Sequence, residues 1–280
     1  MRTVRLEKII ETVEKLAIES CYIAKKEMTE KIDNALKIET SDLGKHVLEK
    51  LLENAQIAEK EWIPYCQDTG VAIIFVELGE EVIFDSPGFI DALNEGVRRG
   101  YKKGYLRKSI VNDPLRRENT GDNTPAIVHI KLVKGDRLRI KFCARGSGSE
   151  NMSKVKMLKP AEGWEGIKSF VLETVKEAGP NPCPPIIIGL GIGGNLEKVP
   201  LLAKNALYRG IGSEHRETFY TEKEKELLEE INNLGIGPQG MGGRVTALEV
   251  HIEEAPCHIG SLPVAVVIEC HAHRYREVEL

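Results

Sequence analysis

The sequence contains no long apolar run. No segment approaches the roughly 18 consecutive apolar residues that cross a bilayer, and residues 1–7 lack the hydrophobic core of a signal peptide. We therefore expect a protein without a membrane segment that works in the cytoplasm.

The chain also lacks an excess of positive charge. It carries 39 Lys and Arg residues against 43 Asp and Glu residues, which gives a formal net charge of -4, and the basic residues are interspersed with acidic ones. Nucleic-acid binding usually depends on a basic face. This composition therefore argues against a nucleic-acid partner.

Closely paired cysteines are absent as well. None of the six cysteines is spaced as C-x-x-C, which excludes zinc ribbons and the ferredoxin type of local cluster loop. Disulfides are rare in a reducing compartment, so free thiols or metal ligands are expected. Any metal site must then be assembled from cysteines that lie far apart in the sequence.

What the chain does contain is enough apolar material for a substantial core, with 41% hydrophobic residues over 280 positions. From Val4 to about Lys60 the apolar residues recur every three or four positions, which predicts helices. Thr40 and Ser41 can cap the helix that follows them, and Asp42 suits its first turn.

The rest of the chain alternates between strand-like and helix-like segments. Helices are predicted at residues 90–103, 163–178, 196–208 and 220–234, and strands at 71–76, 126–133, 138–143, 186–188, 245–252 and 264–268. The strands at 126–133 and 138–143 are expected to form a hairpin through residues 134–136. No further element is expected after Cys270. The predicted fold class is α+β, with a helical N-terminal segment (1–60) followed by a mixed sheet with flanking helices (61–280), all in one domain.

Three cysteines stand where chemistry is often found. Cys66 is followed by Gln67 and Asp68 in a loop that enters a buried strand, although Asp68 could simply bond its own backbone in a turn. Cys183 lies between prolines, which stiffen its loop and suit a metal ligand. Cys270 ends a buried strand.

Several other segments admit two interpretations. Residues 189–194 match G-x-G-x-x-G, so a nucleotide-binding oxidoreductase is an alternative, but the second strand and its acidic residue are missing. Residues 146–151 (GSGSEN) can form an anion-binding nest or a flexible loop. Arg107 can clamp a carboxylate or remain solvated.

A set of motifs in series runs through almost the whole chain: residues 64–70 (PYCQDTG), 119–125 (NTGDNTP), 146–151 (GSGSEN), 183–185 (CPP), and 258–264 (HIGSLPV) leading to Cys270. In this order they resemble the class I fumarate hydratases, specifically the alpha subunit of the two-subunit forms. The alpha subunit of L(+)-tartrate dehydratase is similar throughout.

The resemblance implies a site. Cys66, Cys183 and Cys270 would hold a 4Fe-4S cluster with one iron open to substrate as a Lewis acid. Asp68 would donate a proton to the departing hydroxyl, and His258 would share or tune that proton, unless it is only a hydrogen-bonded core imidazole. The substrate-binding residues would be Gln67, Asp68, Arg107, Gly146 and Gly148.

The resemblance also implies a partner. The base that removes the carbon-bound proton belongs to the carboxy-terminal half of the single-chain enzymes, so a separate beta subunit is expected, in an alpha2-beta2 assembly. The expected reaction is the reversible hydration of fumarate to (S)-malate, with L(+)-tartrate dehydration as the alternative. A third possibility is a non-catalytic assembly partner built on the same scaffold.

Overall fold

The computed structural model describes residues 1–280 and divides into two compact units. The first unit comprises Met1–Ala24, Ala55–Ser147 and Arg274–Leu280, and the second comprises Lys25–Asn54 and Gly148–His273. Each unit encloses a hydrophobic core of its own. The α+β class is confirmed, whereas the single domain over residues 1–280 stays a prediction.

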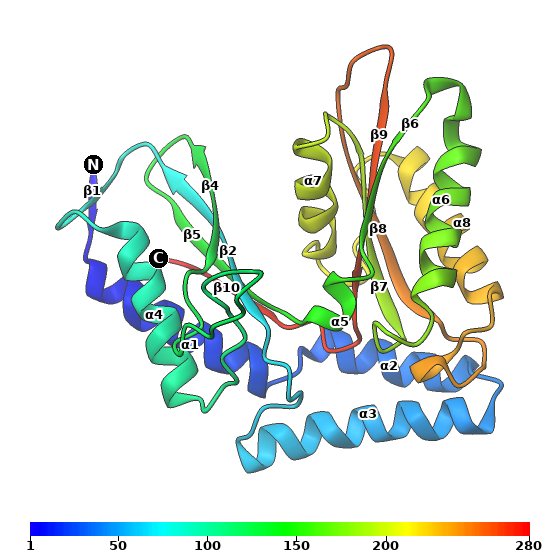
Figure 1. Ribbon diagram of the computed structural model, residues 1–280, viewed down its shortest axis with the longest axis horizontal. Coiled ribbons are helices and arrows are strands. Elements are labelled where there is room, and N and C mark those ends of the chain that lie inside the picture. Colours follow the sequence, from blue (N-terminus) through cyan, green and yellow to red (C-terminus); the bar gives the residue numbers. More distant parts are fainter. The chain divides into compact units, whose positions relative to one another are not determined.

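A four-stranded sheet organises the first unit (Figure 1). Its strands are, in spatial order, β10 (Tyr275–Glu279), β5 (Leu138–Arg145), β2 (Val71–Gly79) and β4 (Ile127–Val133). β2 runs parallel to β4 and antiparallel to β5, and β5 runs antiparallel to β10, so the sheet is mixed.

The expected hairpin between β4 and β5 is wrong, because β2 lies between them. β2 is almost wholly apolar, and in the centre of the sheet its backbone is paired on both sides. β4, which has many exposed side chains, forms the edge. The turn that follows β4 bonds instead to the segment just after β2, where Glu81 N donates to Gly135 O at 2.9 Å. Period-2 alternation identifies strands but not their neighbours.

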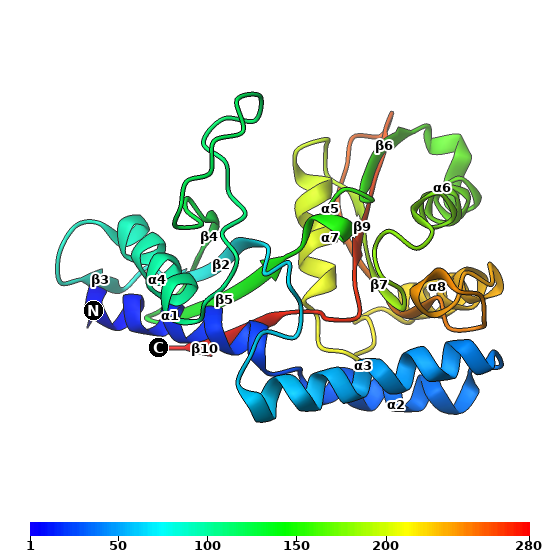
Figure 2. The same cartoon turned by 60° about the horizontal axis from the view of Figure 1, so that its bottom comes forward.

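Two helices, α1 (Leu6–Tyr22) and α4 (Phe89–Lys103), pack side by side in the first unit (Figure 2). Gly96 and Gly100 permit this close contact, since a Cβ at Gly96 would stand 2.6 Å from Val13 Cβ. Two short parallel strands, β1 (Arg2–Val4) and β3 (Val82–Phe84), complete the unit. α4 confirms the predicted helix at 90–103.

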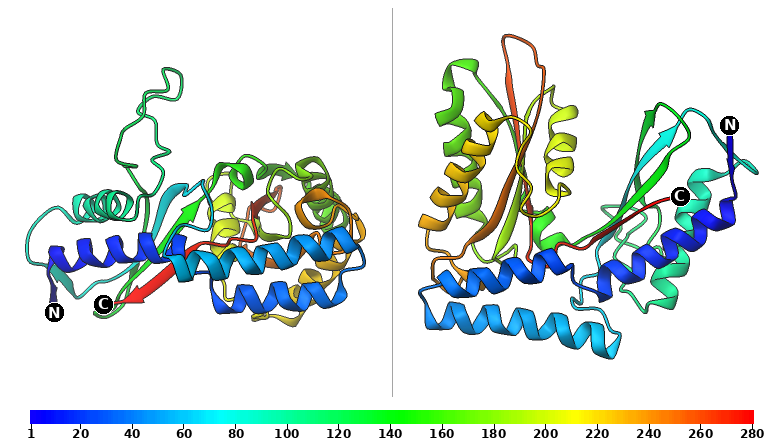
Figure 3. Two further views of the ribbon diagram at one scale, coloured as in Figure 1. Left: turned by 90° about the horizontal axis from the view of Figure 1, so that it is seen from below. Right: turned by 180° about the vertical axis from the view of Figure 1, so that it is seen from behind.

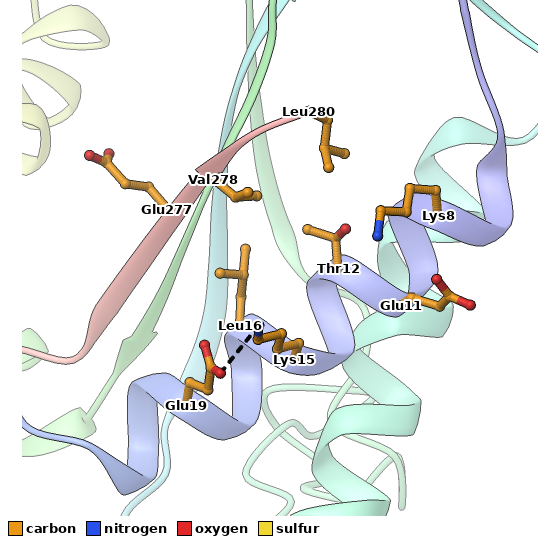
Figure 4. Close-up of a pocket in the computed structure, with 9 residues that line it drawn as sticks. All are labelled: Lys8, Glu11, Thr12, Lys15, Leu16, Glu19, Glu277, Val278 and Leu280. Atoms are coloured by element: carbon orange, nitrogen blue, oxygen red, sulfur yellow. Dashed lines mark ion pairs between the residues drawn. The ribbon is translucent and has the colours of Figure 1, made fainter.

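The expectation that no element follows Cys270 is wrong, because β10 follows it. Tyr275–Glu279 pairs with β5, with Val278 opposite Ile140, and so forms an edge of the sheet in the first unit. A hollow of about 420 Å³ lies between this strand and α1. Lys15, Glu19 and Glu277 are among the residues that line it (Figure 4). None of the predicted site residues lines it.

The second unit contains the other mixed sheet, with helices on both of its faces (Figures 1 and 3). Its strands are, in spatial order, β6 (Lys154–Leu158), β9 (Leu262–Glu269), β7 (Ile186–Gly193) and β8 (Ala247–Ala255). One face carries α7 (Lys198–Leu207), and the other carries α6 (Gly163–Ala178) and α8 (Thr218–Asn233). The remaining short elements are α5 (Ser147–Glu150), η1 (Pro160–Glu162) and η2 (Pro238–Gly240).

The glycine-rich segment after Cys183 is a strand rather than a phosphate-binding turn. β7 continues through Gly189 and Gly191 to Gly193, and all of its residues are buried. A Cβ at Gly191 would lie 2.3 Å from the Val199 carbonyl oxygen, so these glycines allow α7 to rest directly on the sheet. The G-x-G-x-x-G match therefore reflects helix-on-strand packing.

α2 (Lys26–Ile38) and α3 (Asp42–Glu61) complete the helical start. Ser41 Oγ accepts the N–H of Gly44 at 3.1 Å, which confirms the predicted cap. Between the two helices, the buried carboxylate of Glu39 accepts N–H groups from Thr40, Ser41, Arg244 and Val245 at 2.7–2.9 Å. None of the helices combines the length and apolar character needed to cross a bilayer.

Candidate functional site

The loop before β2 carries three of the predicted site residues in succession. Cys66 and Asp68 are half-buried and Gln67 is exposed, all within the turn that leads from α3 to β2 in the first unit. Cys66 Sγ lies 3.9 Å from Gln67 Oε1. The loop position predicted for these residues is confirmed.

The carboxylate of Asp68 is held by backbone and side-chain donors. Its Oδ1 accepts the Gly70 N–H at 3.1 Å, and its Oδ2 accepts both the N–H and the hydroxyl of Ser147, at 2.9 and 3.2 Å. The predicted turn around Asp68 therefore exists, but it uses only one carboxylate oxygen. The other oxygen draws Asp68 to residue 147, at the end of β5.

Gly146 leaves the space in which this arrangement forms. A Cβ at Gly146 would stand 3.2 Å from Asp68 Oδ2 and 3.2 Å from Arg274 Nη2. The segment predicted as a nest or a flexible loop is instead a single helical turn, α5. Gly146 belongs to the first unit and Gly148 to the second.

Arg107 is connected to the Asp68 loop through its backbone. Thr69 Oγ1 donates to the Arg107 carbonyl oxygen at 3.0 Å, while the Arg107 side chain is exposed. An exposed guanidinium can form a bidentate pair with the carboxylate of a ligand. The first unit thus brings Cys66, Asp68 and the Arg107 backbone into one hydrogen-bonded region.

The second unit connects the loops of Cys183 and Cys270. His271, which follows Cys270, donates from Nδ1 to the Cys183 carbonyl oxygen at 3.0 Å. Cys183 is exposed with φ +55°, and Cys270 is half-buried at the end of β9. A non-glycine residue in the left-handed region is uncommon and often accompanies a functional site. No sequence motif marks His271, because it is a lone histidine that follows a strand.

His258 lies elsewhere in the second unit. It is exposed on the turn between β8 and β9, and its Nδ1 accepts the Gly260 N–H at 3.0 Å, so the neutral ring carries its proton on Nε2. It is therefore not a core imidazole. It borders an apolar groove of about 370 Å³ that is also lined by Trp164, Phe219 and Tyr220.

β9 separates His258 from Cys270. The turn with His258 precedes the strand and Cys270 follows it, and its 8 residues span about 26 Å. Cys183 lies at the same end as Cys270, since Ile187 pairs with Glu269. One copy of the second unit thus does not place His258 beside these two cysteines.

The three predicted cluster ligands are divided between the units. Cys66 belongs to the first unit, and Cys183 and Cys270 belong to the second. Within neither unit do three or more His, Cys, Asp or Glu side chains gather as a possible metal site. The ligand set stays a prediction.

The family model described as fumarate hydratase (Fumerase) matches residues 10–279, nearly the whole chain. This chain belongs to the fumarate hydratase family. The match includes both units and every predicted site residue.

Named relatives extend the comparison. The putative L(+)-tartrate dehydratase subunit alpha of Methanocaldococcus jannaschii is 44% identical over 274 residues, which cover 95% of each chain. The L(+)-tartrate dehydratase subunit alpha of Escherichia coli K12 is 34% identical over 252 residues, which cover 89% of this chain and 82% of the relative. The corresponding protein of Shigella sonnei is similar to the same extent.

Proposed function

We propose that this family member is the alpha subunit of a hydro-lyase that reversibly hydrates fumarate to (S)-malate. The observation that carries the proposal is the loop of Cys66, Gln67 and Asp68, in which a thiol, an amide and a fixed carboxylate follow one another. The family match over residues 10–279 supports it.

Asp68 is the proposed acid. In the dehydration direction it gives its proton to the oxygen of the departing hydroxyl as the C–O bond breaks, and a base removes the proton from the neighbouring carbon. In the hydration direction the proton returns to Asp68. The donors at Gly70 and Ser147 hold the carboxylate in one orientation, which is what proton transfer over a short distance requires.

The remaining proposed contacts bind the dicarboxylate. Arg107 would pair with one carboxylate of the substrate, and Gln67 would donate from its side-chain amide. Gly146 and Gly148 would allow the substrate to approach the backbone, since neither carries a side chain. None of these roles requires Asp68 to leave its turn.

The cysteines fit the proposed 4Fe-4S cluster by accessibility. Cys21 and Cys143 are 0% exposed, and Cys257 adjoins His258 at the other end of β9 from Cys270. The other three, Cys66, Cys183 and Cys270, are at least partly accessible and would hold the cluster through thiolates. When bound, the cluster would supply an iron that polarises the C–O bond as a Lewis acid.

A separate beta subunit would supply the base, and two such pairs would form an alpha2-beta2 assembly. The relatives' names contain the words "subunit alpha", which supports a partner. We retain His258 as a proposed second proton carrier. Because β9 separates it from Cys270, it would serve a site at that cysteine from a second copy of the chain. A cluster of this kind also favours a reducing compartment, so we propose the cytoplasm.

L(+)-tartrate dehydration is the second candidate, favoured by the names of the relatives. The test is an anaerobic assay of the reconstituted alpha–beta pair on fumarate, (S)-malate and L(+)-tartrate. A higher kcat/KM for fumarate supports the first candidate, and a higher value for tartrate replaces it with the second. Full activity of the chain without its partner would contradict the role assigned to the beta subunit.

The rivals outside this class make different predictions. A nucleotide-binding oxidoreductase would need the glycines at 189–194 in a turn, but Gly189 and Gly191 lie within β7. A non-catalytic assembly partner would require no cluster. Protein prepared without oxygen should contain close to four irons and four sulfides per chain if the hydro-lyase proposal holds.

A further inference from the structure

Three buried side chains hold three successive carbonyl groups of the Asp68 loop. Arg274 Nη1 donates to the carbonyl oxygen of Asp68. The Tyr101 hydroxyl lies 2.7 Å from that of Thr69 and 3.1 Å from that of Gly70, and Asn123 Nδ2 donates to the Gly70 carbonyl at 3.1 Å. All of these residues belong to the first unit.

The burial of these donors shows that the arrangement is specific. Tyr101 and Asn123 are 0% exposed and Arg274 is 3% exposed. Burying a hydroxyl, an amide or a guanidinium is unfavourable unless it is hydrogen-bonded, and here each is bonded to the same three-residue turn. They come from α4, from the loop before β4, and from the segment that enters β10.

The same network reaches the segment of Arg107. Asn123 Oδ1 accepts the Ser109 N–H at 2.6 Å, and Thr69 Oγ1 donates to the Arg107 carbonyl. Asn123 adopts φ +64°, a conformation that asparagine tolerates better than most residues. These bonds thus join the backbone of Asp68, the proposed acid, to the backbone around Arg107, the proposed carboxylate-binding residue.

We propose that Tyr101, Asn123 and Arg274 are positioning residues for Asp68, which set the direction of its carboxylate toward the substrate. The inference rests on the proposed function, in which Asp68 is the acid. These residues do not touch the reacting atoms; they restrain the peptide units on either side of Thr69. A small displacement of a catalytic group can lower a rate about 100-fold.

The first test compares Tyr101→Phe with a matched control, Tyr22→Phe. Tyr22 is also buried in the first unit, and its hydroxyl donates to the Gly104 carbonyl at 2.7 Å, outside the Asp68 loop. In the assembled holoenzyme, Tyr101→Phe should lower kcat about 10- to 100-fold with little change in KM, while Tyr22→Phe retains kcat. Equal kcat in both variants, with equal losses of thermal stability, would reduce Tyr101 to a core residue.

A second pair of variants tests the arginine. Arg274→Lys keeps a cationic donor, whereas Arg274→Met removes it, so the lysine variant should retain more of the wild-type kcat. If the two variants have the same kcat at equal thermal stability, Arg274 has no positioning role. Asn123→Asp, which keeps the acceptor for Ser109 but loses the donor to Gly70, should lower kcat as Tyr101→Phe does.

A readout independent of turnover separates this inference from the proposed function. The amides of Gly70 and Ser147 donate to the Asp68 carboxylate, so their hydrogen exchange reports how well Asp68 is held. Tyr101→Phe should accelerate exchange at both amides, and Tyr22→Phe at neither. Unchanged exchange in Tyr101→Phe overturns the positioning role even if the enzyme is active. An inactive wild type with accelerated exchange in the variant would overturn only the function.

Discussion

The carboxylate of Asp68 accepts the backbone N–H of Ser147 at 2.9 Å, although the two residues are separated by 79 positions in the sequence. This contact joins the loop before β2 to the residue that follows shortly after β5, and these two strands pair as neighbours in the sheet. With this contact, both oxygens of the Asp68 carboxylate are held, whereas the turn with Gly70 holds only one. The chemistry proposed for this protein depends on that fixed orientation.

Asp68→Asn should abolish most of the activity. The amide retains an oxygen for Gly70, but it has no proton to give at the departing hydroxyl, so kcat should fall by about 10²- to 10⁴-fold. Steady-state assays of the assembled enzyme measure this, with Asp136→Asn as the control, since Asp136 is exposed in the turn after β4. Wild-type kcat in Asp68→Asn would remove Asp68 from the mechanism.

Replacing the proposed ligands should lower the iron content. Cys66→Ser, Cys183→Ser and Cys270→Ser should each lose the cluster or bind it weakly, because a serine hydroxyl is a poor ligand for this iron. Cys257→Ser is the matched control, since it is an exposed cysteine at the far end of β9 from Cys270. Iron and sulfide analysis of anaerobic protein measures the effect. A full complement of iron in the first three variants would contradict the ligand assignment.

Glu39 should make the second unit sensitive to acid. Burial raises the pKa of Glu39, but the backbone N–H groups of Ser41, Arg244, Val245 and Thr40 outweigh it and hold the pKa below the ordinary 4.5. A lowered folded pKa stabilises the protein above pH 4.5, and that stability is lost as the pH falls through the folded value.

Glu39→Gln tests this dependence. At pH 7 it should lower the unfolding free energy by about 1–3 kcal/mol, because an amide group replaces an oxygen that accepts N–H bonds. The difference from wild type should shrink in acid. Thermal unfolding from pH 7 to pH 3 measures it, with the exposed Glu230→Gln on α8 as the control. A difference that stays constant with pH would mean that the charge of Glu39 contributes nothing.

Gly191→Ala should destabilise the second unit by about 1–3 kcal/mol or more, because its new Cβ would stand 2.3 Å from the Val199 carbonyl oxygen and force α7 off the sheet. Gly210→Ala is the control, since a Cβ there has nothing within 4 Å. Chemical denaturation measures both. Equal stability of the two variants would contradict the packing role of the β7 glycines.

The sequence by itself determined the helices and most of the strands. The repeat of apolar residues every three or four positions placed α6 and α4 within a residue of their bounds, and Ser41 marked the start of α3. These features depend on local geometry and local hydrogen bonds. The motif residues around Cys66 and Asp68 were likewise correctly assigned to a loop before a strand.

Pairing and juxtaposition were decided only by the tertiary structure. Three features follow from which apolar faces can be buried together: the insertion of β2 between β4 and β5, the return of residues 275–279 as an edge strand, and the division into two four-stranded sheets. The hydrogen bond from Arg274 to the Asp68 carbonyl also depends on the tertiary structure, because it joins positions 206 residues apart. Local sequence patterns carry no information on such contacts, because only the completed fold sets their geometry.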